Sequence, residues 1–272
     1  MGVLKPPDRQ TSNEVRREVL MEVPEIRRSI DRLNLVYRLY HWAWTGLDLL
    51  YPPHCGGCNK SGARWCGICQ NRVSYLRPPL CVKCGRMVLQ VGLCPNCRLN
   101  SPPYQALRSW AFYEGALRNA IRRLKYAGDM ALGEILSHPL IQMLRELNWQ
   151  IEIVTPVPQG HIRQETRGYN QAALLAFPLA LNFRLAYRPE VLMKVRETRS
   201  QVGLSLAERF ENVAGVFKAN PKIAKGKTIL VIDDVTTSGA TMQACGSALM
   251  DAGASLVYSL TLARAEHQEF GQ

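Results

Sequence analysis

The stretch LVIDDVTTSGATM, residues 230–242, joins an apolar run to two adjacent carboxylates and then to a loop of hydroxyls with one glycine. The apolar run predicts a buried strand over 228–232, from whose end Asp233 and Asp234 emerge. Ligands of parallel sheets gather beyond the carboxyl ends of the strands. The loop enters a predicted helix, and the N–H groups at a helix N-terminus favour a phosphate. The stretch therefore predicts a pocket for a phosphorylated ligand, with two acids placed to accept hydrogen bonds from a ribose diol.

Apolar runs alternate with amphipathic segments from residue 104 onward. We expect strands at 108–114, 151–158, 190–195, 213–217, 228–232 and 255–263, and helices at 115–128, 168–183 and 240–254. Such alternation predicts an α/β domain with a mainly parallel sheet flanked by helices. The segment NSPPY, residues 100–104, indicates a domain boundary. We therefore expect three parts: an N-terminal helical extension over 1–43, a cysteine module over 44–103 and the α/β domain over 104–272.

Eight of the nine cysteines form four C-x-x-C pairs. The eight are Cys55, Cys58, Cys66, Cys69, Cys81, Cys84, Cys94 and Cys97. One pair can place both sulfurs on a single ion, and two pairs complete a closed tetrahedral thiolate site that suits zinc. We therefore expect about two structural Zn²⁺ ions, with no open position for catalysis. A disulfide framework is disfavoured because we recognise no signal peptide, and redox C-x-x-C chemistry because no βαβ pattern surrounds the pairs.

Two pairings of these cysteine knuckles are open at this point. Sequential pairing would join Cys55/Cys58 with Cys66/Cys69, whereas an interleaved arrangement would join Cys55/Cys58 with Cys81/Cys84. We favour sequential pairing because shorter loops close at lower entropic cost.

The formal net charge is +12, and residues 41–103 hold seven basic residues against one acidic residue. A basic chain favours anionic partners such as phosphates or nucleic acid, although a solvated basic surface explains the same count. Four thiolates and one Zn²⁺ carry a formal charge of about −2, so two zinc sites would lower the cysteine module from about +6 to about +2. No uninterrupted apolar run is long enough for a transmembrane helix, so we expect no membrane insertion and a cytoplasmic protein.

The stretch at 230–242 closely resembles the phosphoribosyl-pyrophosphate (PRPP) motif of type I phosphoribosyltransferases. In that family the acidic pair contacts the ribose hydroxyls, and the loop binds the 5′-phosphate. The resemblance implies that Asp233 and Asp234 contact the ribose. The residues that it implies for the 5′-phosphate are Thr237, Ser238, Gly239, Ala240 and Thr241.

The wider sequence resembles ComF-type proteins over roughly residues 44–265. The motifs that carry this resemblance include LDLLYPPHCGGC at 47–58, PVPQGHIRQETRGYNQAALLA at 156–176 and RSQVGLSLAERFENVAGVF at 199–217. ComF-type proteins join a cysteine zinc module to a phosphoribosyltransferase-like domain, and they are linked to DNA uptake in naturally competent bacteria. The resemblance implies the same architecture here.

Two further loops are candidates for ligand binding. The polar segment after strand 151–158 suits a pyrophosphate, whose charge needs cations and donors, and by resemblance it is the pyrophosphate loop. The span 193–212 is by resemblance the flexible loop that shields the reaction from water. The candidate residues of these loops are Arg163, Arg167, Gly168, Asn170, Gln171, Arg196, Gln201 and Arg209.

In the predicted helix at 115–128, Arg118, Arg122 and Lys125 fall on one face. This face is either a solvated basic surface or an anion-binding stripe beside the site, with Lys125 nearest the following loop.

These features support two functions of different kinds. In the first, Mg²⁺ and PRPP bind, diphosphate leaves C1′ and a nitrogen nucleophile attacks, as in a phosphoribosyltransferase of DNA uptake or nucleotide metabolism. Nothing in the sequence identifies the acceptor or a general base. In the second, the pocket holds a nucleotide or a DNA end without turnover. The zinc module and the basic helix then guide single-stranded DNA within a competence or DNA-processing machinery.

Overall fold

The computed structural model describes residues 35–50, 52–198 and 205–265. Gln201 and residues 1–34 of the predicted N-terminal extension lie outside the described residues.

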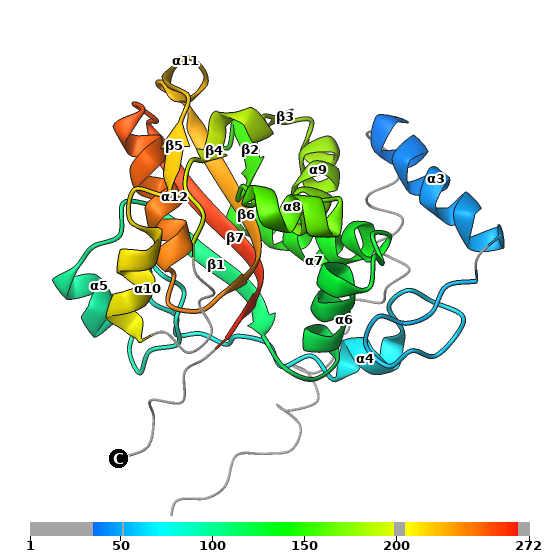
Figure 1. Ribbon diagram of the computed structural model, residues 1–272. Helices are drawn as coiled ribbons and strands as arrows, with labels where there is room; N and C mark the ends of the chain where they lie inside the picture. Colours follow the sequence, from blue (N-terminus) through cyan, green and yellow to red (C-terminus); the bar gives the residue numbers. More distant parts are fainter. Residues whose placement is uncertain (1–34, 51, 199–204, 266–272) are drawn as a thin grey trace, which may run out of the picture.

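A five-stranded sheet in the order β1-β7-β6-β2-β3 organises the α/β part of the chain, and all of its pairings are parallel (Figure 1). Its strands are β1 (Ala106–Phe112), β2 (Ile153–Pro156), β3 (Ala186–Tyr187), β6 (Thr228–Thr236) and β7 (Leu256–Arg264). A separate antiparallel pair is formed by β4 (Leu192–Lys194) and β5 (Phe217–Ala219). The predicted mainly parallel α/β fold is confirmed.

The helices around the sheet are α6 (Gly115–Tyr126), α7 (Leu132–Leu147), α8 (His161–Arg167), α9 (Gln171–Phe183), α10 (Leu206–Val213), α11 (Pro221–Ala224) and α12 (Ala240–Asp251). A 3₁₀ turn, η1, spans Pro189–Val191. Ahead of β1 lie α3 (Leu35–Leu50), α4 (Gly67–Asn71) and α5 (Pro95–Leu99).

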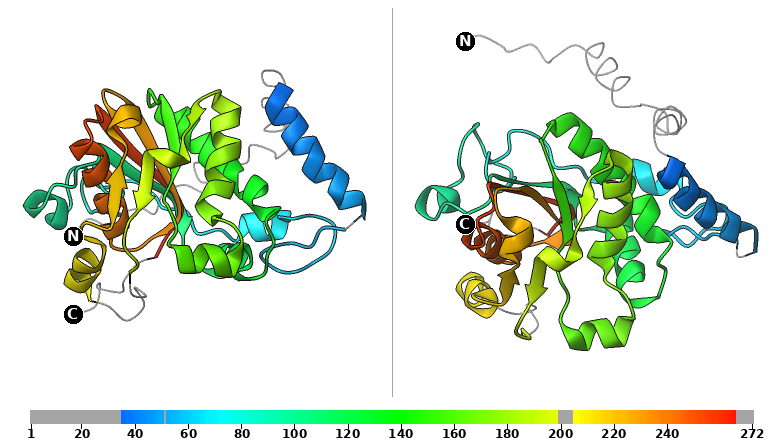
Figure 2. Two further views of the ribbon diagram at one scale, coloured as in Figure 1. Left: turned by 45° about the horizontal axis from the view of Figure 1, so that its top comes forward. Right: turned by 90° about the horizontal axis from the view of Figure 1, so that it is seen from above.

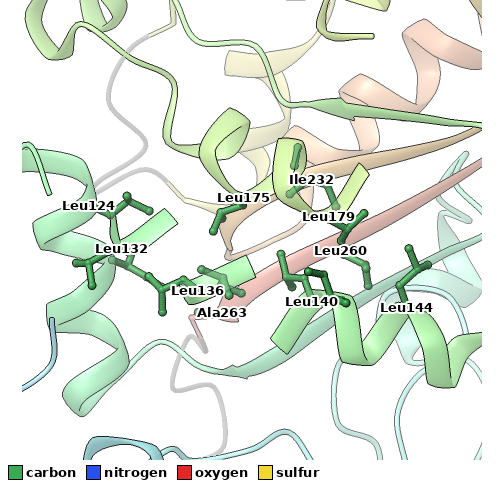
Figure 3. Packing of buried hydrophobic residues seen from close by; sticks show 14 of the residues in the cluster. Leu124, Leu132, Leu136, Leu140, Leu144, Leu175, Leu179, Ile232, Leu260 and Ala263 are labelled. Atoms are coloured by element: carbon green, nitrogen blue, oxygen red, sulfur yellow. The ribbon is translucent and has the colours of Figure 1, made fainter. Parts of the chain in front are cut away.

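Helices cover both faces of the sheet. Leu230 and Ile232 of β6 pack with α7 and α9, whereas Ile229 and Val231 alternate to the opposite face and pack with α12. Figure 3 shows the first of these layers, with leucines of α7 and α9 packed over β6 and β7. Full burial of one such side chain contributes about 1.5–3 kcal/mol. Because both faces are buried, the strands have nearly continuous apolar sequences.

Strand β6 is longer than the sequence predicts. We expected it to end at Ile232, but its pairing with β7 continues through Asp233, opposite Thr261, to Thr236, opposite Arg264. The ladder with β7 holds these four residues extended although two of them are acidic. The two carboxylates therefore lie within the last part of the strand and not in the loop beyond it.

Three local predictions need correction. The segment after β2, predicted as a polar loop, contains the short helix α8. The strand predicted at 213–217 is mostly not a strand, because Val213 ends α10 and β5 begins only at Phe217. Helix α7 was not predicted at all. It contains Pro139 but buries a leucine stripe against the sheet, and this packing outweighs the poor local propensity.

Helix α3 packs on the α/β part through aromatic and polar contacts. Tyr37 is buried in the same apolar cluster as α7 and α9. His41 Nδ1 lies 2.8 Å from Oε1 of Glu134, a buried carboxylate of α7 that also contacts His138 Nε2 at 3.0 Å. Among the described helices, none combines the length and apolar character needed to cross a bilayer.

Candidate functional site

The acidic pair lies at the carboxyl end of the central strand β6. Asp233 Oδ1 accepts a hydrogen bond from the Asp234 backbone N–H at 2.9 Å. The Asp234 side chain is buried, and its Oδ2 lies 2.5 Å from Nζ of Lys125, a residue of the last turn of α6. The structure therefore places Lys125 directly on one of the two predicted ribose-binding acids.

Lys125 gives the two acids different pKa values. Burial alone would raise the pKa of Asp234, but the Lys125 ammonium outweighs it and the net pKa is lowered. Burial raises the pKa of Asp233 well above its ordinary value, and the neighbouring Asp234 charge adds to this rise. Asp234 is therefore a charged carboxylate whose charge is balanced by the Lys125 ammonium. Asp233 is the acid that gains more from a hydrogen-bond donor or a cation brought by a ligand.

The predicted phosphate loop connects β6 to α12. Gly239 stands before the first turn of α12 with φ of 88°, a left-handed conformation that other residues adopt only with strain. Ser238 Oγ accepts a hydrogen bond from the Ala240 N–H at 3.3 Å. Gly239, the residue at the N-cap position of α12, makes no side-chain cap hydrogen bond. The loop leads into the N-terminus of α12, whose backbone N–H groups can bind an anion, and Thr237 and Thr241 add hydroxyls nearby.

The predicted pyrophosphate segment is tied to the end of α6. Tyr169 donates a hydrogen bond from its hydroxyl to Leu124 O at 2.5 Å, one residue before Lys125. The Arg167 guanidinium lies 4.9 Å from the ring centre of Tyr126, which is largely exposed. Both contacts bring this segment to the helix end that carries the lysine of the acidic pair.

Asn170 and Gln171 have structural contacts in this segment. Asn170 caps α9 by accepting from Ala172 N–H at 2.9 Å, and its amide donates to Val157 O at 3.0 Å. Gln171 Oε1 accepts from Arg167 at 2.9 Å. Gly168 ends α8 in the left-handed region. Arg163 is in α8, but its side chain lies outside what the structure describes.

The flexible-loop candidates do not converge on the acidic pair in the part of this span that the structure describes. Arg196 donates to Ala214 O at 3.1 Å, and Arg209 is buried within α10. Lys194 is paired with Glu197 at 3.5 Å. A carboxylate oxygen of Glu197 would lie only 2.1 Å from a Cβ placed on Gly160, so this side chain rests on the start of α8.

The eight cysteines form two clusters with sequential pairing, as we favoured. Cys55, Cys58, Cys66 and Cys69 form the first, and Cys81, Cys84, Cys94 and Cys97 form the second. Sulfur atoms lie 3.6 Å apart for Cys55 and Cys69 and 3.7 Å apart for Cys84 and Cys94. A tetrahedron with Zn–S bonds of about 2.3 Å has edges of about 3.8 Å, so both clusters fit structural zinc. The cysteines of the described residues are free thiols.

Backbone donors favour one thiolate in each cluster. The Cys66 N–H donates to Cys55 Sγ at 3.4 Å, and the Cys94 N–H donates to Cys81 Sγ at 3.3 Å. Burial raises the thiol pKa, but these and other backbone N–H groups outweigh it and lower the pKa of Cys55 and of Cys81 to about 6. Thiolates are the form that binds zinc.

The two clusters pack on different elements of the α/β part. In the first, Arg123 of α6 donates to Cys55 O at 3.2 Å, and Asn119 donates to Gly57 O at 3.1 Å. In the second, Arg108 of β1 donates to Val82 O at 3.1 Å, and the Leu107 N–H donates to Lys83 O at 2.7 Å. Figures 1 and 2 show α4 of the first cluster and α5 of the second on opposite sides of the molecule.

Two adjoining cavities of about 480 and 550 Å³ lie beside the first cluster, and both are lined by Arg123 and Ala127. Arg122 lines one of them, and Arg64, His54 and Trp44 line the other. These cavities are separate from the acidic pair and the phosphate loop, none of whose residues lines them.

Known domain families and proteins match both parts of this architecture. Residues 46–98 match the double zinc ribbon domain, and residues 189–270 match the phosphoribosyl transferase domain. Competence protein F of Haemophilus influenzae is 28% identical over 225 residues, which cover 78% of this chain and 96% of that protein. Competence protein ComFC of Bacillus subtilis is 26% identical over 229 residues, covering 81% of this chain and 89% of that protein. The chain is thus similar to ComF-type proteins in both parts.

A further relative is DNA utilization protein YhgH of Salmonella typhimurium, 29% identical over 205 residues that cover 73% of this chain and 89% of that protein. Among solved structures, glutamine PRPP amidotransferase from B. subtilis aligns with a TM-score of 0.32 and 22% identity over 53% of this chain. The chain spans about a quarter of that enzyme, 27% of its length.

Some contacts of the ComF-type site were missed by sequence reasoning. The helical pattern grouped Lys125 with Arg118 and Arg122, yet only Lys125 turns inward to Asp234, while the two arginines are exposed. Tyr169 had no signal beyond its place in RGYNQ. Arg264 lies one residue past the predicted last strand, and no pattern singled it out.

Proposed function

We propose that this protein binds Mg²⁺-PRPP and acts as a phosphoribosyltransferase-like protein in DNA uptake or nucleotide metabolism. The observation that carries the proposal is the continuity of the acidic pair with the phosphate loop. Asp233 and Asp234 lie in the last part of β6, and Gly239, the residue directly before α12, follows five residues after Asp234. In this proposal a ribose 5-phosphate binds with its diol on the acids and its phosphate at the helix N-terminus.

The residues of this chain would each contribute binding or charge stabilisation. Asp234 is held in place by Lys125, and Asp233 would accept from the ribose diol. Arg167 lies beside the α6 end and would meet the diphosphate. Mg²⁺ bound with PRPP neutralises diphosphate charge, and the carboxylates offer the hard oxygen donors that this ion prefers. Stabilising the departing diphosphate is the main catalytic contribution that such a site can make.

Calorimetry with Mg²⁺-PRPP tests this function. Wild type should bind, and Asp233→Asn should weaken binding by at least tenfold, because one charge-assisted hydrogen bond contributes about 1.5–3 kcal/mol. Asp251→Asn is the matched control, since Asp251 is an exposed acid at the far end of α12. Absence of PRPP binding by folded, zinc-loaded wild type would overturn the proposal.

A second function, binding of single-stranded DNA without turnover, is favoured by the two cavities beside the first cluster. Arg122 and Arg123 of α6 and Arg64 from the cysteine module bring positive charge to adjoining hollows, and Trp44 offers a ring. Such a surface suits phosphates and stacked bases. In this reading the partners are DNA and the proteins that process it.

Salt dependence separates DNA binding from PRPP binding. Arg122→Ala should reduce the slope of log affinity against log salt by about 0.7, the value for one phosphate contact on a single strand. Arg118→Ala removes an equal charge from the same helix, but Arg118 lines neither cavity, so its slope should stay near that of wild type. Equal slopes for wild type and Arg122→Ala would count against DNA binding at these cavities.

Both functions place the protein in the cytoplasm. Eight thiols in two four-sulfur clusters are compatible with a reducing compartment, where zinc-bound cysteines are kept from oxidation.

A further inference from the structure

The end of strand β7 links the second cysteine cluster to the phosphate loop. Arg264 is the last residue of β7, and its backbone stands opposite Thr236, the residue directly before the loop. The Ala265 N–H donates to Thr236 O at 2.9 Å, and the Tyr113 N–H donates to Arg264 O at 2.8 Å. The backbone of Arg264 is therefore fixed at the edge of the sheet where the loop begins.

The side chain of Arg264 runs from this edge to the second cluster. Its guanidinium donates to the backbone oxygen of Cys84, a cluster cysteine whose Sγ lies 3.7 Å from that of Cys94. Arg264 is only 2% exposed, so the contact is made away from water. Its Nε finds no hydrogen-bond partner among the residues that the structure describes. A buried guanidinium is costly unless its partners stay in place, so Arg264 depends on the position of Cys84.

Tyr104 makes a second connection between the second cluster and the loop. Its hydroxyl lies 3.6 Å from the position that a Cβ would take on Gly239, and its backbone lies 3.6 Å from that of a Cβ on Gly246 of α12. Lys83, between the cysteines of one knuckle, donates to Tyr104 O at 3.1 Å.

Within the part of the chain that the structure describes, the first cluster makes no comparable hydrogen bond to the end of β7 or to Tyr104. Its backbone oxygens accept hydrogen bonds from Asn119 and Arg123 of α6, and in Figures 1 and 2 its helix α4 lies on the other side of the molecule from α5. The two clusters therefore differ in what they support, although they share the same ligands.

We propose that the second four-cysteine site and the phosphate loop form one coupled unit, joined by Arg264 and Tyr104, so that zinc in this site holds the loop in its phosphate-binding conformation. The inference rests on the proposed function, because it concerns the same loop. Arg264 and Tyr104 are positioning residues: neither needs to touch the ligand. Loss of zinc from the second site releases Cys84, and with it the anchor of Arg264, so phosphate binding weakens while the acidic pair is unaffected.

Coupling of this kind is reciprocal, and this gives a test on wild type alone. A ligand that fills the phosphate loop must raise the zinc affinity of the second site by the factor by which zinc raises ligand affinity. We would titrate the full-length, zinc-loaded protein with a chelator at equilibrium, with ribose 5-phosphate or with ribose. We choose ribose 5-phosphate because we expect it to bind without Mg²⁺, an ion that would itself bind the chelator and disturb the zinc titration. We expect two steps of zinc transfer to the chelator. With ribose 5-phosphate, the apparent zinc affinity in one step should rise by about fivefold or more, and with ribose the affinity should change in neither step.

Variants assign the step and test the two connections. Cys58→Ser alters an exposed ligand of the first cluster and should change the other zinc step. Arg264→Lys and Tyr104→Phe should keep two zinc ions per chain, yet lose the ligand-dependent shift and bind ribose 5-phosphate several-fold more weakly. Arg108→Lys is the matched control. It weakens the attachment of the same knuckle to β1, so it should lower zinc affinity but leave the ligand-dependent shift in place.

The outcomes separate this inference from the proposed function. If wild type binds neither PRPP nor ribose 5-phosphate, the proposed function falls and the inference falls with it. If wild type binds both but the second-site zinc step does not move, or both steps move equally, the inference is overturned and the proposed function stands. Retention of the full shift in Arg264→Lys and in Tyr104→Phe would overturn the assignment of these residues.

Discussion

Lys125 Nζ lies 2.5 Å from Asp234 Oδ2, and both side chains are largely withdrawn from solvent. The contact joins the last turn of α6 to the central strand across 109 residues of sequence, so it fixes the position of a helix as well as the charge of an acid. Breaking such a pair on one side leaves an uncompensated buried charge.

Lys125→Met should therefore destabilise the protein by about 3 kcal/mol, measured by urea unfolding of zinc-loaded protein. The double variant Lys125→Met/Asp234→Asn should recover part of this loss because no lone charge remains. Lys227→Met is the control: its pair with Glu152 is about half exposed on both sides, so its removal should change stability by less than about 1 kcal/mol. A similar loss for both lysines would contradict the buried-pair account.

The contacts of His41 and His138 with Glu134 predict that the stability of the fold falls in acid. Burial raises the pKa of Glu134, but hydrogen bonds from His138 and His41 outweigh it and lower the pKa to about 2. A carboxyl whose pKa is depressed on folding contributes stability above its ordinary value of about 4.3, and this contribution is lost as pH falls toward 2. Two pKa units correspond to about 3 kcal/mol at most.

Glu134→Gln should remove this contribution. Unfolding of wild type and variant, compared between pH 7 and pH 3, should show a stability difference that is largest at pH 7 and shrinks in acid. Taking the difference at each pH cancels the acid loss of zinc, which both proteins share. A difference that is constant with pH would show that the carboxylate charge does not stabilise the fold.

Gly239 should tolerate no side chain without strain. Its φ is 88°, and the nearest atom to a new Cβ is the Tyr104 hydroxyl at 3.6 Å, so the penalty is conformational and not a clash. Gly239→Ala should cost about 1–2 kcal/mol and should weaken ribose 5-phosphate binding. Gly67→Ala, at the start of α4 with open space around it, should be close to neutral. Unfolding and calorimetry measure both effects; equal behaviour of the two variants would refute the conformational requirement.

Metal content should follow the cluster assignment. Metal analysis of purified wild type should give about two Zn per chain, and Cys97→Ser should give about one, because one four-sulfur site loses a buried ligand. Cys245→Ala should keep two, since Cys245 is buried in α12 outside both clusters. One zinc or none in wild type would rule out two sites of this kind.

The parts of the fold that the sequence predicts well are those decided by local pattern. Strand and helix alternation predicts the parallel sheet, and C-x-x-C spacing with short loops predicts sequential zinc sites. The β6-to-α12 loop is found because its residue types are rare in combination. These signals lie within 5 to 20 residues, so no long-range contact has to be known.

The parts that were missed depend on partners distant in sequence. The length of β6 is set by pairing with β7, and α7 forms because its leucines meet the sheet. The inward turn of Lys125 depends on an acid more than 100 residues away. The helix α8 was obscured by its polar composition, since its exposed side chains provide no apolar stripe. The roles of the loop residues stay predictions until ligand binding is measured.

The Arg264–Cys84 contact has a consequence for biosynthesis, because its partners are separated by 180 residues. The cysteine module leaves the ribosome early and has all of its zinc ligands by residue 97. Strand β1, on which the second cluster packs, has β7 as its sheet partner, and β7 is the last of the described strands to be synthesised. The second cluster can thus be metallated long before it is anchored, and the final assembly step of the nascent chain closes the sheet and anchors the cluster together.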